Sequence, residues 1–169
     1  MNVDTRIDTL AQAYRGIGEK KMKDLPIFNA RLRVEAVDFR DWQGRMIGVM
    51  ISPWFMNLVL LAAPDDDTQA FTQGASSDWD FPAGNYQFHG AEVAGIPHLT
   101  AALFSTVSDF PDQQSARSVA EAVLERLFDE DATQAPERSR KAVGDVLFED
   151  RLSRRSLLRR VMLMPDQEG

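Results

Sequence analysis

The sequence contains no cysteine and only two histidines, His89 and His98. The lack of cysteine excludes disulfide bonds, thiolate nucleophiles, iron–sulfur ligation and most structural zinc sites. A glycine-rich phosphate loop, a Gly-x-Ser-x-Gly elbow and a His-Glu-x-x-His motif are also missing. A catalytic or metal-binding function would therefore rest on the two histidines or on carboxylates alone, and we expect neither catalysis nor a cofactor.

An uninterrupted apolar run that could span a membrane, about 18–20 residues, is lacking as well. The longest apolar segment, residues 46–63, is interrupted by Gly48 and Pro53. Near the N-terminus, Asp4 and Asp8 stand where a secretory signal would carry basic residues. We therefore expect a cytoplasmic protein without stable membrane insertion.

Positive charge is absent from the middle of the chain, where no lysine or arginine occurs between Met46 and Ala116. The same span contains aspartates and a glutamate, and the whole chain has a formal net charge of −7. Such a charge distribution repels nucleic acid and favours a basic peptide or protein as partner. Residues 151–163 show the opposite pattern, with arginines and no acidic residue.

Hydrophobic periodicity predicts an amphipathic helix over residues 4–22 and a second helix that begins near Asp112, with Asp112 or Ser115 as its N-cap. Between the helices, apolar segments predict strands, and the polar, acidic residues 64–83 predict a long loop. The expected strands cover residues 32–39, with a bend at 36–37, and residues 46–52, 54–62, 85–93 and 97–107. The pattern indicates an α+β fold: an antiparallel sheet of about five strands, one N-terminal helix and one helix after the last hairpin.

The last hairpin has a preferred register. With Ala94-Gly95 as its loop, Phe88 faces Ala101 on an apolar face of the sheet. The opposite face is then polar and carries both histidines as diagonal neighbours. A one-residue slip would bury the histidines and expose the aromatic residues, so this register is favoured.

We expect residues 1–150 to form a single domain and residues 151–169 to form a basic, partly flexible tail with short helical segments. Arg154-Arg155 followed by Leu157-Leu158 resembles the start of a twin-arginine export signal. A true signal of this kind lies at the N-terminus, so the tail cannot serve as one. A basic amphipathic helix packed on the domain is the alternative interpretation.

The candidate partner-binding residues form an aromatic–methionine segment after a proline: Pro53, Trp54, Phe55, Met56 and Asn57. Proline prevents regular strand pairing, so the residues after it either line an open groove or belong to a core strand. Aromatic and methionine side chains are enriched in the cores of protein interfaces. The segment therefore predicts a surface for an apolar peptide, with core packing as the alternative.

Acidic residues in the same part of the chain would suit the basic portion of such a partner, or would simply be solvated. These candidates are Asp65, Asp66, Asp78 and Asp80. The two histidines would supply half of a metal site, but the sequence places no third ligand, so two solvated histidines are the other interpretation.

Several of these segments together resemble the HybE/HupJ family of nickel–iron hydrogenase assembly chaperones, in order over residues 5–160. The resemblance is carried by Leu25-Pro26 with Asn29, by Trp42 with Gly44, by residues 51–58, by Phe81-Pro82-Ala83-Gly84, by Phe104-Ser105 and by the arginine pair ahead of leucines in the tail. Residues 53–57 are its most specific part.

The resemblance implies a chaperone that binds the precursor of the iron–sulfur small subunit, including its twin-arginine signal peptide, and delays export until assembly is complete. It implies no cofactor and no catalytic residue. Two alternatives stay open: a protection factor for the small-subunit clusters or the large subunit without signal-peptide contact, and a metal-delivery protein that uses His89 and His98.

Overall fold

The computed structural model describes residues 3–104 and 106–129 of the 169-residue chain. Within these residues the chain forms two α-helices, two shorter helical segments and six strands. The elements in chain order are α1 (Val3–Ile17), the π-helical turn η1 (Gly18–Met22), β1 (Glu35–Trp42), β2 (Arg45–Ile51), β3 (Met56–Leu61), the 3-10 turn η2 (Thr68–Phe71), β4 (Ser76–Phe81), β5 (Gly84–Val93), β6 (Ile96–Ala102) and α2 (Gln113–Leu127).

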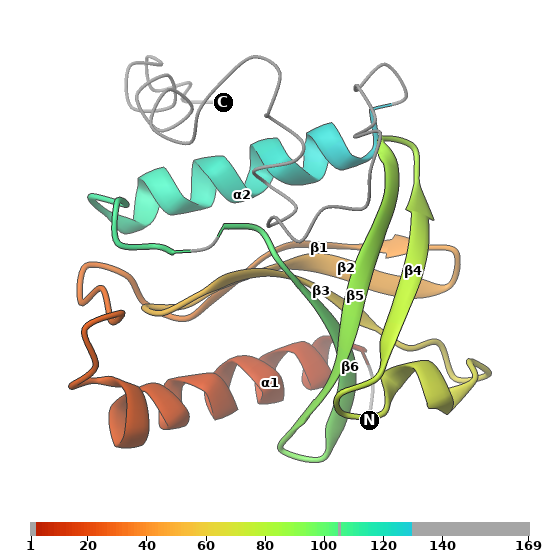
Figure 1. Ribbon diagram of the computed structural model, residues 1–169, viewed down its shortest axis with the longest axis horizontal. Coiled ribbons are helices and arrows are strands. Elements are labelled where there is room, and N and C mark those ends of the chain that lie inside the picture. The colour runs from red at the N-terminus through yellow and green to blue at the C-terminus, as the bar shows by residue number, and fades with distance from the viewer. Residues whose placement is uncertain (1–2, 105, 130–169) are drawn as a thin grey trace.

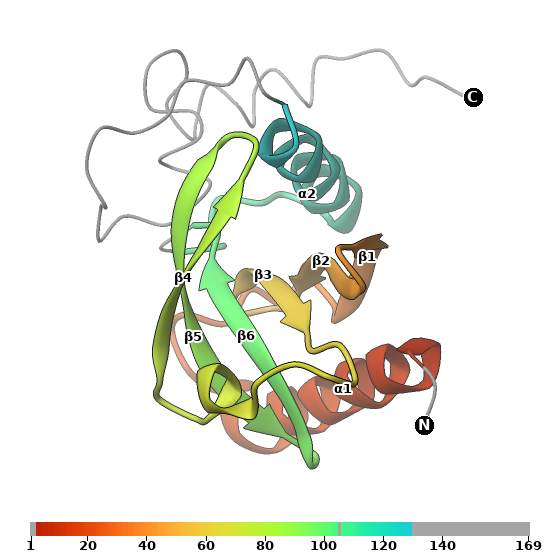
Figure 2. The ribbon, with the colours of Figure 1, turned by 90° about the vertical axis from the view of Figure 1, so that its right-hand side faces the viewer.

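The strands form one antiparallel sheet in the order β1-β2-β3-β6-β5-β4. The helices α1 and α2 lie on opposite sides of this sheet, and the half formed by β4, β5 and β6 is strongly twisted relative to β1, β2 and β3 (Figures 1 and 2). The predicted α+β class is confirmed, with six strands in place of about five. The expected domain boundary at residue 150 and the expected tail at 151–169 lie outside the described residues.

Each face of the sheet has its own core because side chains alternate along every strand. On the α1 face, Leu10 and Tyr14 pack against Val59 and Leu61 of β3. On the α2 face a larger cluster joins the helix to all six strands and to Phe71 of η2. The central strands β2 and β3 are buried on both faces, as their continuous apolar sequence predicts.

Two tight turns set the register of the hairpins. Gln43 and Gly44 both have positive φ, 54° and 80°, and so do Ala94 and Gly95, at 52° and 74°. Such paired left-handed conformations match the twist of the flanking strands. The pairing of Gly90 with Leu99 and of His89 with Thr100 confirms the predicted register of the last hairpin.

The predicted loop over residues 64–83 was wrong in part, because it contains η2 and the edge strand β4. Only one side of β4 is covered: Trp79 and Phe81 point inward, while Asp78 and Asp80 are exposed. Half of its residues are therefore polar, and a composition of serine and aspartate is more typical of a loop than of a strand.

The first and third strands begin later than predicted. Residue 35 opens β1, and its bulge lies between Val37 and Arg40 instead of at 36–37. In the third strand, regular pairing begins at Met56 because residues 52–55 form a turn stabilised by the Ser52 side chain. The second helix agrees with the sequence: Asp112 is its N-cap, and its carboxylate accepts the Ser115 N–H at 2.7 Å.

Gly90 provides a test of how closely η2 and the chain after it approach β5. A Cβ atom on Gly90 would lie 2.1 Å from the Thr72 carbonyl oxygen, whereas one on Gly16 of α1 would have no neighbour within 4 Å. We expect Gly90→Ala to lower the free energy of unfolding by about 1–3 kcal/mol through overpacking. Gly16→Ala should leave it unchanged or raise it by about 0.5–1 kcal/mol, because alanine favours helix. Urea denaturation of both variants measures the difference, and equal stabilities would contradict this account of the contact.

Candidate protein-binding surface

The turn between β2 and β3 is built around the side chain of Ser52. Its hydroxyl oxygen accepts the N–H groups of Trp54 at 3.2 Å and Phe55 at 2.9 Å, and it donates to the Phe55 carbonyl. The Pro53 carbonyl in turn accepts the Asn29 N–H at 2.6 Å. These bonds hold Trp54 and Phe55 at the end of the sheet, beside the segment that follows α1.

Trp54 and Phe55 form an aromatic cluster with the C-terminal part of α1 and the segment after it. The ring centroid of Phe55 lies 5.0 Å from that of Tyr14 and 5.2 Å from that of Trp54, in edge-to-face geometry. The ring of Phe28 stacks on Trp54 at 6.4 Å. Gly18 lets the chain pass Trp54, since a Cβ there would lie 2.9 Å from the indole. The cluster therefore joins three segments that are far apart in the sequence.

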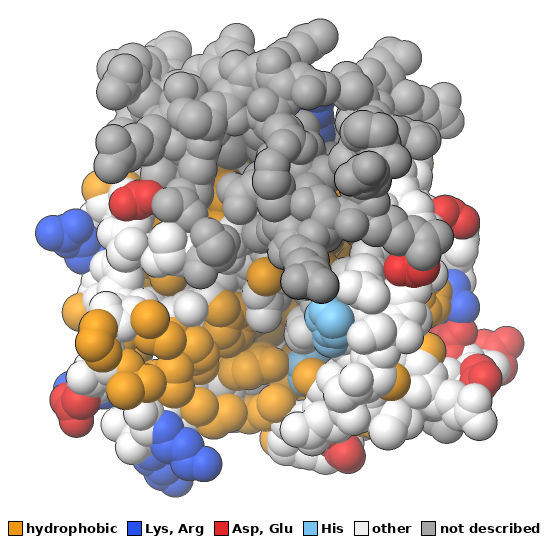
Figure 3. Space-filling view, in the orientation of Figure 1, with side chains coloured by type: hydrophobic (Ala, Val, Ile, Leu, Met, Phe, Trp, Pro, Cys, Tyr) orange, Lys and Arg blue, Asp and Glu red, His pale blue; other side chains and the backbone are white. Residues whose placement is uncertain are grey.

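Two large apolar side chains beside this cluster are exposed: Leu25 at 43% and Ile27 at 51% of their surface. Together with the half-buried Phe28, Trp54 and Phe55 they form a surface that we call the aromatic patch. Figure 3 shows hydrophobic side chains gathered on the lower left of this view, over the end of α1 and the segment that follows it. A contiguous apolar surface of this kind is typical of a protein-binding site.

The sequence motif at residues 53–57 is divided between the patch and the core. Pro53 and Met56 are buried, and Met56 packs in the cluster on the α2 face. Asn57 is half-buried and points to the α1 face, because it lies two residues before Val59 on β3 and side chains alternate between the two faces. The motif thus contributes two rings and one amide to the accessible surface, and core packing accounts for Met56.

A polar surface adjoins the aromatic patch on the same face of the sheet. Paired residues of neighbouring strands point to the same side, so the pairs Val59–Thr100, Thr100–His89 and His89–Ser76 trace one row from β3 to β4. The exposed members of this polar sheet face are Ala102 of β6, Asn85, Gln87 and His89 of β5, and Ser76, Asp78 and Asp80 of β4. Ser76 Oγ lies 3.1 Å from His89 Nδ1, and Asn85 Nδ2 donates to Asp80 at 2.7 Å.

The four candidate aspartates do not gather in one place. Asp78 and Asp80 lie on the polar sheet face, but Asp65 and Asp66 follow β3 at its other end. Arg45 forms a two-pronged ion pair with Asp66, whose carboxylate also accepts the Ala63 N–H at 2.7 Å. The hydrogen bond from Arg45 lowers the pKa of Asp66. Asp66 therefore stabilises the turn after β3, and only Asp78 and Asp80 lie on the same face as Trp54 and Phe55.

The two histidines lie on one face of the sheet but in different environments. His89 is exposed, whereas His98 is covered by α1 and fully buried, so the prediction of two solvated histidines was wrong for His98. The His98 Nδ1–H donates to the Ile96 carbonyl at 2.9 Å, which leaves Nε2 to accept the Tyr14 O–H at 3.0 Å. Both ring nitrogens of His98 are thus occupied. Among residues 3–104 and 106–129 no group of three histidine, aspartate or glutamate side chains is arranged to hold a metal ion.

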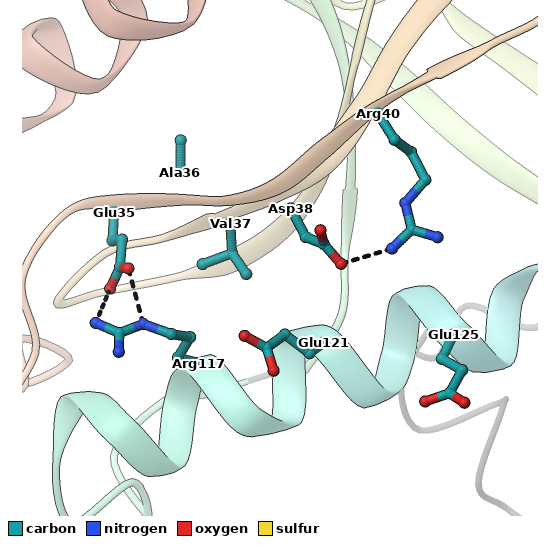
Figure 4. Close-up of a pocket in the computed structure, with 8 residues that line it drawn as sticks. All are labelled: Glu35, Ala36, Val37, Asp38, Arg40, Arg117, Glu121 and Glu125. Atoms are coloured by element: carbon teal, nitrogen blue, oxygen red, sulfur yellow. Dashed lines mark hydrogen bonds and ion pairs between the residues drawn. The ribbon is translucent and has the colours of Figure 1, made fainter. Parts of the chain in front are cut away.

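A hollow of about 480 Å³ lies on the other face of the sheet, between β1 and α2. Figure 4 shows Glu35 paired with Arg117 and Asp38 paired with Arg40, with Glu121 and Glu125 from α2 beside them. Burial alone would raise the pKa of Glu35, but hydrogen bonds from Arg117 and Gln113 and the charge of Arg117 together lower it. The Glu35–Arg117 and Gln113 contacts join the edge strand to α2, so these residues have a structural role.

Comparison with known proteins decides which family this fold and surface belong to. The model of the family described as "NiFe-hydrogenase assembly, chaperone, HybE" matches residues 5–160. The hydrogenase expression/formation protein HupJ of Bradyrhizobium diazoefficiens is 42% identical over 141 residues, which cover 82% of each chain. The chain belongs to this family. The HybE/HupJ resemblance predicted from the sequence is therefore confirmed.

Other relatives support a role in hydrogenase maturation. The hydrogenase expression/formation protein HupT of Azotobacter chroococcum is 34% identical over 88% of this chain and 91% of its own. A protein named probable rubredoxin HupJ, from Rhodobacter capsulatus, is 39% identical over 75% of this chain, which spans only 46% of that protein. The family is one of assembly chaperones and not of enzymes, and the chain takes part in hydrogenase maturation.

The fold is shared with a solved member of the family. The solution structure of HybE from Escherichia coli has a TM-score of 0.57 against this chain, at 17% identity, and covers 77% of this chain and 83% of that one. In the part of the HybE-family chain described here, neither α-helix has the length and apolar character needed to cross a bilayer.

Sequence reasoning found Trp54 and Phe55 but missed half of the aromatic patch. Leu25, Ile27 and Phe28 follow α1 in a segment with no strand or helix periodicity, so no pattern marked them as part of a surface. The helical periodicity of residues 4–22 places Tyr14 on the apolar face of the first helix, but its contact with Phe55 depends on how the helix crosses the sheet. The Leu25-Pro26 and Asn29 positions in the family resemblance were the only signal for this segment.

The buried Tyr14–His98 pair predicts a specific pH dependence of stability. Burial lowers the pKa of His98 below its ordinary value of 6.5, against the opposing effect of the Ile96 carbonyl, and burial raises the pKa of Tyr14 to about 12. The unfolded chain therefore binds a proton near pH 6.5 that the folded chain resists. The contribution of His98 to stability is complete above pH 6.5, and it is lost as the pH falls from there toward the lower pKa of the folded state.

We expect His98→Asn to reduce the fall in the free energy of unfolding between pH 7.5 and pH 5, whatever its effect at pH 7.5. His89→Asn is the matched control, because it makes the same substitution at the exposed histidine of the same sheet face. Urea denaturation at several pH values measures both slopes. A slope that is identical in wild type and His98→Asn would show that His98 is not held neutral by the fold.

Proposed function

We propose that this HybE-family chain is a cytoplasmic chaperone that binds the small-subunit precursor of an exported nickel–iron hydrogenase, including its twin-arginine signal peptide. The observation that carries the proposal is that the aromatic patch and the exposed Asp78 and Asp80 lie on the same face of the sheet. A twin-arginine signal is basic at one end and apolar after it. Both parts would find a complementary surface within one continuous face.

The dimensions of this face suit a short extended peptide. Three strand spacings, about 14 Å at 4.7–4.9 Å each, separate β3, which follows the turn with Trp54 and Phe55, from β4, which carries Asp78 and Asp80. An extended chain of about four residues spans that distance. A peptide whose arginines contact Asp78 and Asp80 can therefore place its apolar residues over Trp54 and Phe55.

The proposed action is reversible binding without covalent chemistry. An apolar signal segment that is covered by the chaperone is hidden from the export machinery, so export is delayed while the subunit matures. Release requires only modest affinity, and we expect a dissociation constant in the micromolar range, about −8 kcal/mol. Ion pairs at the exposed Asp78 and Asp80 would contribute mainly to the rate of association and would weaken with salt.

A second candidate function is protection of the small-subunit iron–sulfur clusters, or of the large subunit, without signal-peptide contact. The relative named probable rubredoxin HupJ favours it, because its name describes an iron protein and more than half of its length lies outside the match. The two functions differ in their requirement for the signal. Co-purification of the chaperone with a small subunit that lacks its signal peptide would support protection, and loss of co-purification would support signal binding.

The aromatic patch should dominate the affinity for a synthetic twin-arginine signal peptide. We expect Trp54→Ala to weaken binding about tenfold or more, since buried aromatic anchors dominate the affinity of such interfaces. Ile27→Ser should weaken it several-fold without loss of core packing, because Ile27 is exposed. Isothermal titration or fluorescence anisotropy measures the affinities. Trp42→Ala is the matched control, since Trp42 is a half-buried tryptophan of the α2-face cluster. Equal effects of Trp54→Ala and Trp42→Ala would remove the patch from the site.

The acidic contribution can be separated by salt. We expect the double variant Asp78→Asn, Asp80→Asn to bind the peptide several-fold more weakly at low salt and to show a smaller loss of affinity as salt is added. The variant Asp41→Asn, Asp65→Asn makes the same change in net charge at exposed positions of β1, the opposite edge strand of the sheet, and of the turn after β3. If both double variants change the salt dependence equally, only the net charge of the protein matters and the face has no specific role.

A further inference from the structure

The aromatic patch and the polar sheet face would suit a ligand that carries arginines and then leucines, and the same chain contains such a sequence. Residues 151–163 include five arginines and no acidic residue, and the pair Leu157-Leu158 lies between Arg154-Arg155 and Arg159-Arg160. In order along the chain, Arg154-Arg155 precedes Leu157-Leu158. The order matches that of the proposed ligand, and no sequence between Met46 and Ala116, which lacks lysine and arginine, offers the same chemistry.

The spacing of these residues fits the spacing of the surface. Leu158 follows Arg154 by four positions, so an extended backbone places them at most about 14 Å apart. The row of paired residues from β3 to β4 covers about the same distance. Arginines at Asp78 and Asp80 and leucines at the aromatic patch are therefore compatible with one extended segment.

The chain between the last described residue and the arginine pair is long enough to reach this face. Asp129 ends the described part, and 25 residues lead from it to Arg154. Such a length spans up to about 80–90 Å, whereas a domain of this size has a radius of gyration of about 14 Å. A segment tethered in this way has an effective concentration on the order of millimolar at any site that it can reach.

We propose that residues 151–163 of the same chain occupy the aromatic patch and the polar sheet face when no partner is bound, and that the signal peptide must displace them. The proposal rests on the proposed function, because it concerns the same surface. The carboxylates of Asp78 and Asp80 pair with Arg154 and Arg155, and Leu157 and Leu158 cover Trp54 and Phe55. The segment covers an apolar surface that would otherwise bind unselected peptides, and only a ligand that fits better than the tether displaces it.

The absence of cysteine makes a direct test possible, since Ser156→Cys introduces the only thiol for a nitroxide spin label. The full-length, labelled protein is observed by NMR through its tryptophan indole and backbone amide signals. We expect broadening of the Trp54 indole and of the Asp78 and Asp80 amides, with the amides of Glu121 and Glu125 in the β1–α2 hollow, on the other face of the sheet, as internal references. Adding Arg154→Glu, Arg155→Glu, Leu157→Ser and Leu158→Ser should abolish the broadening.

Three results would overturn the proposal: no broadening of Trp54, broadening confined to the amides of Glu121 and Glu125 in the β1–α2 hollow, or broadening seen only between separate molecules. Mixing spin-labelled chains with isotope-labelled, spin-free chains detects the last of these. Binding of the signal peptide to the unlabelled tail variant distinguishes this inference from the proposed function. Tail displacement predicts about tenfold tighter binding than wild type. Unchanged affinity means that the tail does not compete, whereas no binding to either protein means that the proposed function itself is wrong.

Discussion

One helix cannot cover one face of a six-stranded sheet, and the rest of this molecule follows from that constraint. Six strands span five spacings, about 24 Å, whereas a helix with its side chains is about 10–12 Å wide. On the α1 face the helix covers the part around Met50, Val59 and Leu61. The remainder of that face has to be either polar or complementary to a partner, and here it is both: polar on β4 and β5, and aromatic at the β2–β3 turn. The α2 face differs because η2 and the inward rings of β4 extend its core beyond the helix.

The boundary between the covered and open parts of the face is held by Tyr14. Its hydroxyl donates to buried His98, while its ring supports Phe55 at 5.0 Å and Trp54 at 6.5 Å. Tyr14 thus provides a hydrogen-bond partner for buried His98, and its ring packs against the Trp54 and Phe55 rings of the aromatic patch. Because the contact with Tyr14 already restricts the Trp54 and Phe55 side chains, they would lose less conformational entropy if a partner bound over them. The Ser52 hydroxyl restricts the backbone of the β2–β3 turn in the same way, because it accepts hydrogen bonds from the N–H groups of Trp54 and Phe55.

The sequence predicted those features that depend on local patterns. The Ala94-Gly95 turn determines the pairing of β5 with β6, and Asp112 caps α2, because turn and cap chemistry act over a few residues. The features that it missed depend on contacts between distant segments. His98 alternates with apolar residues as any half-exposed strand residue would, and only the passage of α1 over it makes it buried. In β4 the pattern of two faces is present, yet its exposed half, Asp78 and Asp80, is polar enough to resemble a loop. The aromatic patch was half predicted for the same reason: Trp54 and Phe55 are adjacent in sequence, and Leu25 and Ile27 join them only in the fold.

The open face also explains how a family of binding proteins can manage without the residues that enzymes require. Catalysis needs groups held in a water-excluded site with perturbed pKa values, whereas the accessible residues of this face are aromatic rings, amides, carboxylates, the Ser76 hydroxyl and the exposed His89. The group on this face with a clearly lowered pKa, His98, is sealed beneath α1 with both nitrogens occupied. Under the proposed function, selectivity for a partner comes from the order of charge and apolar surface along an extended segment. Order is a weak criterion for a single contact but a strong one when acidic and aromatic surfaces lie several strand spacings apart on one sheet, because a segment with the reverse order would place its arginines against Trp54 and its leucines against carboxylates.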